Sequence, residues 1–251
     1  PWKWLFQVIG KSKVPIMNSA GGTEVSGSIL HCCLHRPFKV GSFNAPIPGM
    51  SADILNLDGQ KVSTNEMGEL VMRKSSIGLT KSLWNDDKRY IDNYWSVIKD
   101  YWVHGDLASR DADGHWYLHG RSDDTIKVSG KRIGPSELES VIVKSGKAKE
   151  VAAVGIPDEN KGSKIILSIV PAENNDQKES FFEDLVIKDL GKSFKPDKVI
   201  FVKDLPKTRN MKIMRRVIKS CLANQDPGDL STLLNPESVS YTHLTLPTNT
   251  P

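Results

Sequence analysis

Cysteine is scarce in this sequence, with only Cys32, Cys33 and Cys221 among 251 residues. Three cysteines cannot form the disulfide framework of a small secreted protein, and their spacing does not match the CxxC pairs of a zinc site. No apolar run approaches the ~18 residues of a membrane span, and the first residues lack the basic, apolar and small-residue order of a secretory signal. We therefore expect reduced thiols in a cytoplasmic protein without a membrane span.

A strong charge imbalance is also absent. Lys and Arg (34) exceed Asp and Glu (30) so little that the net charge is +4. This is far below the concentrated positive charge of a nucleic-acid-binding domain, so we expect no nucleic-acid partner. The mildly basic charge is compatible with a small anionic ligand. The hydrophobic share of 38% and the charged share of 25% are typical of a globular protein. The length fits one large or two ordinary domains.

Residues 1–122 predict a β-rich unit. An alternation of apolar and polar residues over 51–57 leads into Asp58-Gly59, which is a hairpin signal, and residues 69–73 resemble the partner strand. A second turn and a short strand follow over residues 111–118. Strands this short and this closely spaced favour a sheet-rich subdomain.

Residues 123–222 predict a small α+β domain with a three-stranded sheet, because helical and strand patterns alternate there. The expected strands cover residues 151–154, 165–170 and 199–202, and the expected helices begin at Gly134-Pro135, cover residues 182–190 and cover residues 213–222. The overall fold class expected is therefore mixed α/β and α+β.

Residues 223–251 are expected to form a tail. Asn224 to Gly228 breaks the last helix, and residues 240–251 contain no charged side chain apart from a possible charge on His243. No periodicity in these last twelve residues would pack them onto a core. We interpret them as an appended segment that is extraneous to the fold.

Two motifs in the first unit carry candidate chemistry. The first is Asn18-Ser19-Ala20-Gly21-Gly22-Thr23-Glu24. Adjacent glycines let a backbone approach a ligand closely, and a hydroxyl followed by a carboxylate can hold a phosphate oxygen and its Mg²⁺. The second joins His104-Gly105-Asp106 to Arg121, where a carboxylate beside a guanidinium could hold the hydroxyls of a ribose. A common loop and a surface salt bridge are the alternatives.

Two further motifs lie later in the chain. The polar run from Gly120 to Gly134 lies where the short strand patterns of the first unit give way to alternating helical and strand patterns. It therefore indicates a hinge between domains or an ordinary charged linker. The run from Pro206 to Arg216 places Lys212 between a loop and a helix, where its flexible stem could carry a positive charge to developing phosphate charge. A solvated basic helix face is the alternative for this run.

In order and spacing, these four motifs resemble the C-terminal part of the acyl-CoA synthetases of the adenylate-forming superfamily, with acetyl-CoA synthetase-like members nearest. The resemblance covers about residues 1–222, and the run Gly120-Arg121-Ser122-Asp123-Asp124 through Arg132 is its most specific part. It implies a ligase that joins a carboxylic acid to ATP to give an acyl-adenylate and then transfers the acyl group to CoA. The implied substrates and cofactors are ATP, Mg²⁺ and CoA, with no bound prosthetic group.

The resemblance also implies roles for individual residues. Thr23 and Glu24 match the residues for the α-phosphate and Mg²⁺, and Lys212 matches the lysine needed for adenylate formation. Asp123 matches the hinge residue. The remaining implied roles are nucleotide or acyl-pocket binding at Asn18, Ser19, Gly21 and Gly22, ribose contact at Asp106 and Arg121, and the thioester-forming loop at Ser129, Gly130 and Arg132, with Gly130 beside pantetheine.

Three departures from the family pattern qualify these expectations. No Ser-Gly-Thr-Thr-Gly-like phosphate loop is present, so we expect a fragment that lacks most of the large domain and cannot form an adenylate alone. Met211 stands where the family usually has Gly. Gly21 stands where acetate-specific members have Trp, which predicts a deeper acyl pocket and a short- or medium-chain acid other than acetate.

Two other functions remain open at this stage. An adenylation enzyme could pass its acyl group to a carrier-protein thiol instead of CoA. A basic module could use the Lys212–Lys219 face on nucleic acid, although no aromatic residues are interleaved with that charge. The sequence does not fix the oligomeric state or the acid, and acylation of Lys212 would remove its charge.

Overall fold

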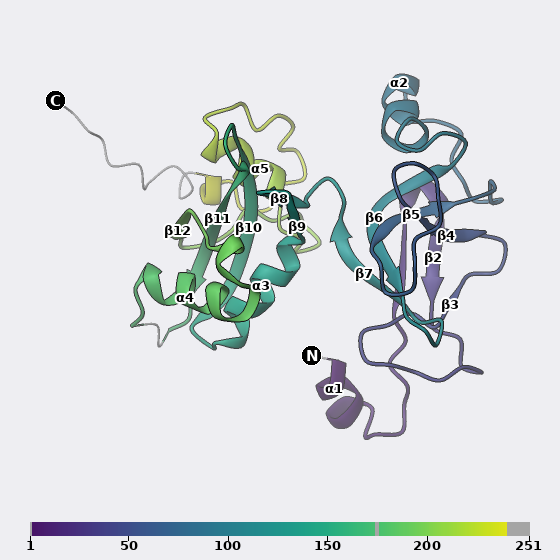
Figure 1. Cartoon of the computed structure of the whole chain (residues 1–251), viewed down its shortest axis with the longest axis horizontal. Coiled ribbons are helices and arrows are strands. Elements are labelled where there is room, and N and C mark those ends of the chain that lie inside the picture. The colour runs from purple at the N-terminus through teal and green to yellow at the C-terminus, as the bar shows by residue number, and fades with distance from the viewer. Residues whose placement is uncertain (1, 174–175, 240–251) are drawn as a thin grey trace. The chain divides into compact units, whose positions relative to one another are not determined.

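The computed structural model describes residues 2–173 and 176–239. The chain divides into two compact units, Pro1–Asp123 and Asp124–Pro251, and each combines strands with helices, which confirms the mixed fold class (Figure 1). The segment interpreted as appended, residues 240–251, lies outside the described residues. Every helix within the described residues is too short or too polar to cross a bilayer.

The first unit contains two sheets and several short helical turns. One sheet consists of β1 (Ser19–Gly22), β2 (Gly27–His31) and β3 (Ala45–Pro46), and the other of β4 (Ala52–Leu55), β5 (Gly68–Met72), β6 (Trp102–Arg110) and β7 (Trp116–Arg121), with neighbouring strands antiparallel. The helical turns are α1 (Trp2–Trp4), η1 (Leu5–Ile9), η2 (Thr23–Val25), α2 (Asp87–Tyr90) and η3 (Ile91–Trp95).

The predicted strand pair of this unit is present as β4 and β5, with Ala52 opposite Met72. The turn after β4 contains Gly59 at a φ of 78°, a conformation that glycine adopts without a steric penalty. All five residues of β5 are buried. Leu70 and Met72 pack in one apolar cluster with Trp102 of β6, whereas Val71 packs in another with Ile98, so both faces of the sheet are covered.

A half-buried carboxylate ties the loop before β3 to the hairpin between β6 and β7. Asp111 accepts hydrogen bonds from the backbone N–H groups of Asp113 and His115, and its Oδ2 lies 2.6 Å from Nζ of Lys39. The hydrogen bond from Lys39 lowers the pKa of Asp111 from its ordinary 3.8 to about 2, and the bond from His115 assists. The same contacts raise the pKa of Lys39.

We expect Asp111→Ala to lower the melting temperature of the first unit by roughly 2–4 °C at pH 7. Because folding lowers this pKa, the stabilisation is present above about pH 4 and is lost as the pH falls from about 4 towards about 2. Thermal unfolding at several pH values checks this, with Asp58→Ala in another exposed turn as the control. A difference that does not change with pH would contradict the ionic origin.

The second unit contains a two-stranded hairpin and a three-stranded sheet with helices. Its elements are β8 (Ile126–Val128), β9 (Lys131–Ile133), α3 (Pro135–Lys144), β10 (Ala148–Asp158), β11 (Gly162–Pro171), α4 (Glu179–Leu190), η4 (Lys192–Phe194), β12 (Lys198–Phe201) and α5 (Arg215–Leu222). The sheet order is β10-β11-β12, with β10 antiparallel and β12 parallel to β11. This confirms the predicted three-stranded sheet.

The three-stranded sheet is buried on both faces. Alternate residues of β10 supply the two faces, because successive side chains of a strand point in opposite directions. Val151 and Ala153 pack in one apolar cluster with residues of α3 and α4, whereas Ala152 and Val154 pack in another with Ile218 of α5. The hairpin β8–β9 packs in the first cluster, and residues at both ends of the Lys212 loop pack in the second.

Candidate functional site

Thr23 and Glu24 lie at the tip of the hairpin that joins β1 and β2. β1 ends at Gly22, which pairs with Gly27, and η2 makes the turn between them. Ser26 closes the turn in the left-handed conformation, and Val25 anchors it with 1% exposure. The turn therefore presents a hydroxyl and a carboxylate side by side from a fixed backbone.

The carboxylate of Glu24 is held by an aromatic residue that the sequence did not suggest. The hydroxyl of Tyr94 donates to Oε1 of Glu24 at 3.0 Å, and its ring stacks on Trp102 with centroids 5.2 Å apart. Burial, followed by the bond to Glu24 and its negative charge, raises the pKa of Tyr94. Tyr94 therefore remains protonated, as a donor to this carboxylate must.

Asp106 and Arg121 meet across the β6–β7 pair. They are direct partners in the strand register, and Nη1 of Arg121 lies 3.8 Å from Oδ1 of Asp106 and donates to the carbonyl of His104 at 2.9 Å. Burial lowers the pKa of Arg121, but the carboxylates of Asp123 and Asp106 outweigh burial and raise it. The guanidinium therefore stays charged beside Asp106.

Gly105 is required for this arrangement. Its φ is 82°, and a methyl group placed on it would lie 2.6 Å from Nη2 of Arg121. Only glycine therefore lets the guanidinium lie over β6. The preceding residue, His104, is buried and places Nε2 3.2 Å from Oδ2 of Asp106. His104 and Gly105 both stand in the sequence motif, but their spacing did not predict the contact of His104 with Asp106 or the closeness of Gly105 to Arg121.

These residues form one cluster, which we call the carboxylate cluster: Glu24, Tyr94, His104, Asp106 and Arg121. Glu24 and His104 approach each other at Gly22. A methyl group placed on Gly22 would lie 3.0 Å from Oε2 of Glu24 and 3.2 Å from Cε1 of His104. Sequence reasoning chose three of the five members. Tyr94 could not be found from spacing, because it reaches Glu24 from seventy residues away.

The other predicted residues of the first motif hold the strands together. The amide of Asn18 donates to the carbonyl of Ser42 at 2.9 Å, and the hydroxyl of Ser19 lies 2.5 Å from that of Ser28. Within the part of the chain that the structure describes, neither side chain hydrogen-bonds to a member of the carboxylate cluster. Ligand-binding roles for Asn18 and Ser19 therefore stay predictions.

Gly21 lies at a bulge where the register between β1 and β2 shifts. A methyl group placed on it would lie 2.0 Å from the carbonyl oxygen of Gly27 and 2.5 Å from Cα of Ser28. The direction in which a side chain would project is therefore filled by β2 and offers no free volume. The predicted acyl-pocket role of Gly21 stays a prediction that only substrate preference can test.

In the second unit, Ser129 and Gly130 form a tight turn between β8 and β9. Both have positive φ values, 49° and 80°, and Val128 pairs with Lys131 across them. Two successive residues of this kind make the type I′ turn that suits two-residue hairpins. Arg132 lies exposed on β9 opposite Lys127. The run interpreted as a hinge or linker therefore contains a hairpin.

Asp123 is the last residue of the first unit. Its Oδ1 accepts from Nε of Arg121 at 3.2 Å, so it is tied to the carboxylate cluster. Asp124, the first residue of the second unit, lies 3.9 Å from Nη1 of Arg215. Each of these neighbouring carboxylates therefore has a cationic partner in its own unit.

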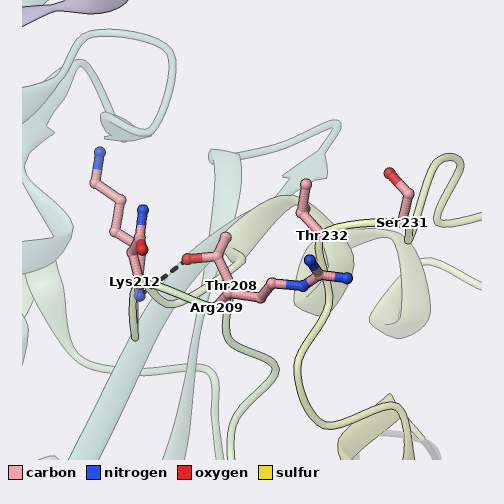
Figure 2. Close-up of a pocket in the computed structure, with 6 residues that line it drawn as sticks. Thr208, Arg209, Lys212, Ser231 and Thr232 are labelled. Atoms are coloured by element: carbon pink, nitrogen blue, oxygen red, sulfur yellow. Dashed lines mark hydrogen bonds between the residues drawn. The ribbon is translucent and has the colours of Figure 1, made fainter.

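Lys212 is exposed in a closed turn, which we call the lysine loop (residues 206–214). Lys207 and Ile213 form an antiparallel bridge, and the N–H of Thr208 donates to the carbonyl of Lys212 at 2.8 Å. The hydroxyl of Thr208 accepts from the N–H of Lys212 at 3.2 Å (Figure 2). The predicted final helix therefore begins only at Arg215, because these bonds close the turn first.

Met211 occupies the strained position of this turn, with a φ of 61°. A left-handed conformation costs a residue with a side chain about 1–2 kcal/mol. We expect Met211→Gly to raise the free energy of unfolding of the second unit by about 1 kcal/mol, after the larger unfolded-state entropy of glycine is deducted. Denaturant titration measures this free energy. Arg209→Gly in the same loop is the control and should be destabilising. Equal effects of Met211→Gly and Arg209→Gly on the free energy of unfolding would argue against backbone strain at Met211.

The lysine loop is fastened by the C-terminal segment (residues 230–239), part of the stretch expected to be a tail. Asn235, 9% exposed, accepts from the N–H of Lys207 at 3.0 Å and donates to Oδ2 of Asp204 at 2.6 Å. The N–H of Leu234 donates to the carbonyl of Lys207 at 2.8 Å. Leu233, Leu234 and Asn235 thus join this segment to the lysine loop.

An open cavity of about 470 Å³ lies between the lysine loop and this segment. Thr208, Arg209, Asn210, Lys212, Ser231 and Thr232 line it. In Figure 2 the guanidinium of Arg209 extends towards Thr232, while the side chain of Lys212 extends away from Ser231 and Thr232. The ammonium of Lys212 therefore projects from the lysine loop on the side away from Ser231 and Thr232.

Comparisons with known proteins show what the two units resemble. Residues 137–212 match the family model of the AMP-binding enzyme C-terminal domain. Over 95% of its length the chain is 36% identical to the acetyl-coenzyme A synthetase of Pasteurella multocida and 37% identical to that of Methanothrix soehngenii. It spans only 38% and 37% of the lengths of these two relatives.

Solved structures show the same fold. Acetoacetyl-CoA synthetase from Streptomyces lividans matches 96% of this chain with a TM-score of 0.83 at 22% identity, and the chain covers 38% of that protein. Anthranilate CoA ligase AuaEII, solved with anthranoyl-AMP, matches 87% of this chain with a TM-score of 0.71 at 26% identity, and the chain covers 41% of it.

Proposed function

We propose that this chain, a homologue of the C-terminal part of AMP-forming acyl-CoA synthetases, supplies the corresponding part of an enzyme that activates a carboxylic acid with ATP and transfers the acyl group to CoA. The observation that carries the proposal is the carboxylate cluster. Glu24 lies beside His104 at Gly22, and His104 contacts Asp106, which lies next to Arg121, so residues from two distant motifs come together. Had these residues been scattered, the nucleotide assignment would have had no geometric support.

The cluster suits a nucleotide chemically. We assign Asp106 to the ribose, because an ionised carboxylate accepts from two neighbouring hydroxyls, and Arg121 beside it holds the carboxylate in place. Thr23 and Glu24 at the hairpin tip are assigned to the phosphates, with Asn18, Ser19, Gly21 and Gly22 along the binding strand. Tyr94 keeps Glu24 fixed through its hydrogen bond.

Mg²⁺ fits Glu24 only in part. The part of the chain that the structure describes contains no group of three or more His, Cys, Asp or Glu residues suited to hold a metal ion. Magnesium in nucleotide enzymes takes one or two carboxylates together with substrate phosphates and water, so a single carboxylate at Glu24 is compatible with it. When bound, the ion would neutralise phosphate charge.

The first step is the attack of the substrate carboxylate on the α-phosphorus of ATP, which forms an O–P bond and releases pyrophosphate. Two anions approach each other in this step, so a cation that moves in with the nucleotide lowers the barrier. We assign this role to Lys212, whose ammonium projects from the lysine loop. The N–H of Thr208 donates to the carbonyl of Lys212 and its hydroxyl accepts from the N–H of Lys212, which holds the loop closed behind the ammonium.

The second step is the attack of the CoA thiolate on the acyl carbonyl, which forms the thioester and expels AMP. We assign the β8–β9 turn, with Ser129, Gly130 and Arg132, to this step. Gly130 has open space beside it, so its positive φ is what requires glycine there. Asp123, at the border of the two units, is assigned as the hinge that lets the second unit present either the lysine loop or this turn.

The proposal includes ATP, CoA and a short- or medium-chain acid as small-molecule substrates, and a cytoplasmic location. It is tested in the full-length gene product that carries this chain, by measuring pyrophosphate release from ATP with a panel of acids. Release that depends on an acid supports it, and no release with any acid overturns it. CoA and a holo-carrier protein compared as acceptors identify the thiol, and strong preference for acetate would contradict the expectation from Gly21.

A matched pair of variants localises the activity. Glu24→Gln removes the carboxylate of the cluster, and Asp58→Asn removes an exposed carboxylate elsewhere in the first unit. Only the former should lower pyrophosphate release. The chain by itself should release none, because it covers only 38% of the first of these relatives.

A further inference from the structure

The C-terminal segment adds a third strand to the lysine loop. Within the loop, Lys207 pairs with Ile213 in an antiparallel bridge. On the other side of the same strand, Thr208 forms an antiparallel bridge with Leu233, and the N–H of Leu234 donates to the carbonyl of Lys207 at 2.8 Å. An isolated two-stranded hairpin is only marginally stable in water. The strand that carries Lys207 and Thr208 is therefore fixed by its bonds to both neighbours.

Asn235 makes the side-chain contacts of this third strand. It is 9% exposed, and its Oδ1 accepts from the N–H of Lys207 at 3.0 Å. Its Nδ2 donates to Oδ2 of Asp204 at 2.6 Å and to the carbonyl of Leu205 at 2.8 Å. These bonds use the carbonyl and both N–H groups of the amide. Asn235 therefore joins the C-terminal segment to the residues that lead into the lysine loop.

The backbone of Asn235 is fixed as well. Its carbonyl accepts from the N–H of Ser238 at 3.0 Å and from the hydroxyl of Ser238 at 2.6 Å, and Ser238 is fully buried. Lys212, by contrast, is exposed, and its side chain extends away from Ser231 and Thr232 (Figure 2). The position of its ammonium therefore depends on the backbone of the lysine loop, which the C-terminal segment holds.

We propose that Asn235 is a positioning residue for Lys212, because it joins the C-terminal segment to the strand that enters the lysine loop and so holds the ammonium in place for adenylate formation. The inference rests on the proposed function, because it takes Lys212 as the cation of the first half-reaction. It also separates the two half-reactions. The β8–β9 turn packs in a different apolar cluster from the ends of the lysine loop, so thioester formation does not depend on Asn235.

The test is Asn235→Asp in the full-length protein. The new carboxylate can still accept from the N–H of Lys207, but it places an oxygen where Nδ2 donated to Asp204. We expect kcat for acid-dependent pyrophosphate release to fall by about 10–100-fold with the KM for ATP unchanged, because misplacing a group by about 1 Å has an effect of this size. Thioester formation from supplied acyl-adenylate and CoA should stay near the wild-type rate, whereas a purely structural role would lower both half-reactions alike.

An exchange variant and a matched control accompany this test. Asn235→Asp combined with Asp204→Asn exchanges donor and acceptor, so the bond between the two side chains can form again and pyrophosphate release should recover in part. Asn160→Asp makes the same change in the exposed turn between β10 and β11, and it should leave both half-reactions at wild-type rates. Backbone hydrogen exchange in Asn235→Asp should be faster in residues 204–214 and unchanged in the β8–β9 hairpin.

The outcomes distinguish this inference from the proposed function. Equal losses in both half-reactions, no loss in either, or no recovery in the exchange variant would show that Asn235 does not position Lys212, while the proposed function would stand. If the wild type releases no pyrophosphate with any acid, the proposed function itself fails.

Discussion

Replacing Lys212 with alanine should reduce acid-dependent pyrophosphate release by about 100-fold or more while leaving thioester formation from supplied acyl-adenylate near the wild-type rate. The physical reason is that the ammonium offsets charge only where carboxylate and phosphate approach each other. In the second half-reaction the thiolate attacks a carbonyl, and AMP leaves without a second anion being brought to phosphorus. The loss is therefore confined to the first half-reaction.

The measurement uses the full-length protein and follows the two half-reactions separately: pyrophosphate release with acid and ATP, and acyl-CoA formation with acyl-adenylate and CoA. Lys219→Ala is the matched control, because it removes the same charge from the exposed face of α5. Equal losses in both half-reactions would mean that Lys212 supports the fold instead of the chemistry. Loss with Lys219→Ala as well would point to a general electrostatic effect.

Replacing Lys207 with methionine is expected to destabilise the second unit by about 2–4 kcal/mol. Lys207 is 7% exposed, and its Nζ lies 2.8 Å from Oδ1 of Asp204 and 2.6 Å from Oε2 of Glu150. Methionine fills the space but leaves both carboxylates without their cation. The estimate lies below that for a fully buried pair, because both carboxylates still reach water.

The stability loss should also depend on pH. Burial raises the pKa of Asp204, but the bonds from Lys207, Leu205 and Asn235 outweigh it and lower the pKa below the ordinary value. The stabilisation from this group is therefore present above that ordinary value and is lost as the pH falls through the lowered one. Urea titrations of wild type and variant at pH 7 and at pH 3 should show the difference shrinking.

Lys192→Met, which removes an exposed lysine of the same unit, is the control for Lys207→Met. It should change the free energy of unfolding by less than about 0.5 kcal/mol. A similar result for both variants would show that Lys207 contributes as a surface residue. Because Lys207 lies in the lysine loop, the variant should also lower adenylate formation in proportion to the fraction of unfolded protein.

The sequence predicted the regular elements of the second unit because their patterns are local. The apolar run of β10 and the proline that begins α3 each suffice to identify an element. The continuous apolar run is typical of a strand buried on both faces, but it does not show which helices cover each face. The hairpin β8–β9 was missed because its polar residues resemble a linker.

The carboxylate cluster was partly predictable for a different reason. Glu24, Asp106 and Arg121 stand in motifs whose residue types suggest nucleotide chemistry. Tyr94 stands in no motif, and its contact with Glu24 depends on the stacking against Trp102 that only the folded unit creates. Likewise, Asn235 could not be distinguished from the polar tail around it until its bonds to Asp204 and Lys207 were seen.

The two-sided packing of the three-stranded sheet has a consequence for how the second unit can serve both half-reactions. The β8–β9 turn belongs to the layer with α3 and α4, and the lysine loop to the layer with α5. The two therefore lie on opposite faces of the sheet. Under the proposed assignment, a partner surface that contacts one face cannot contact the other at the same time, so the two half-reactions would require the second unit to turn.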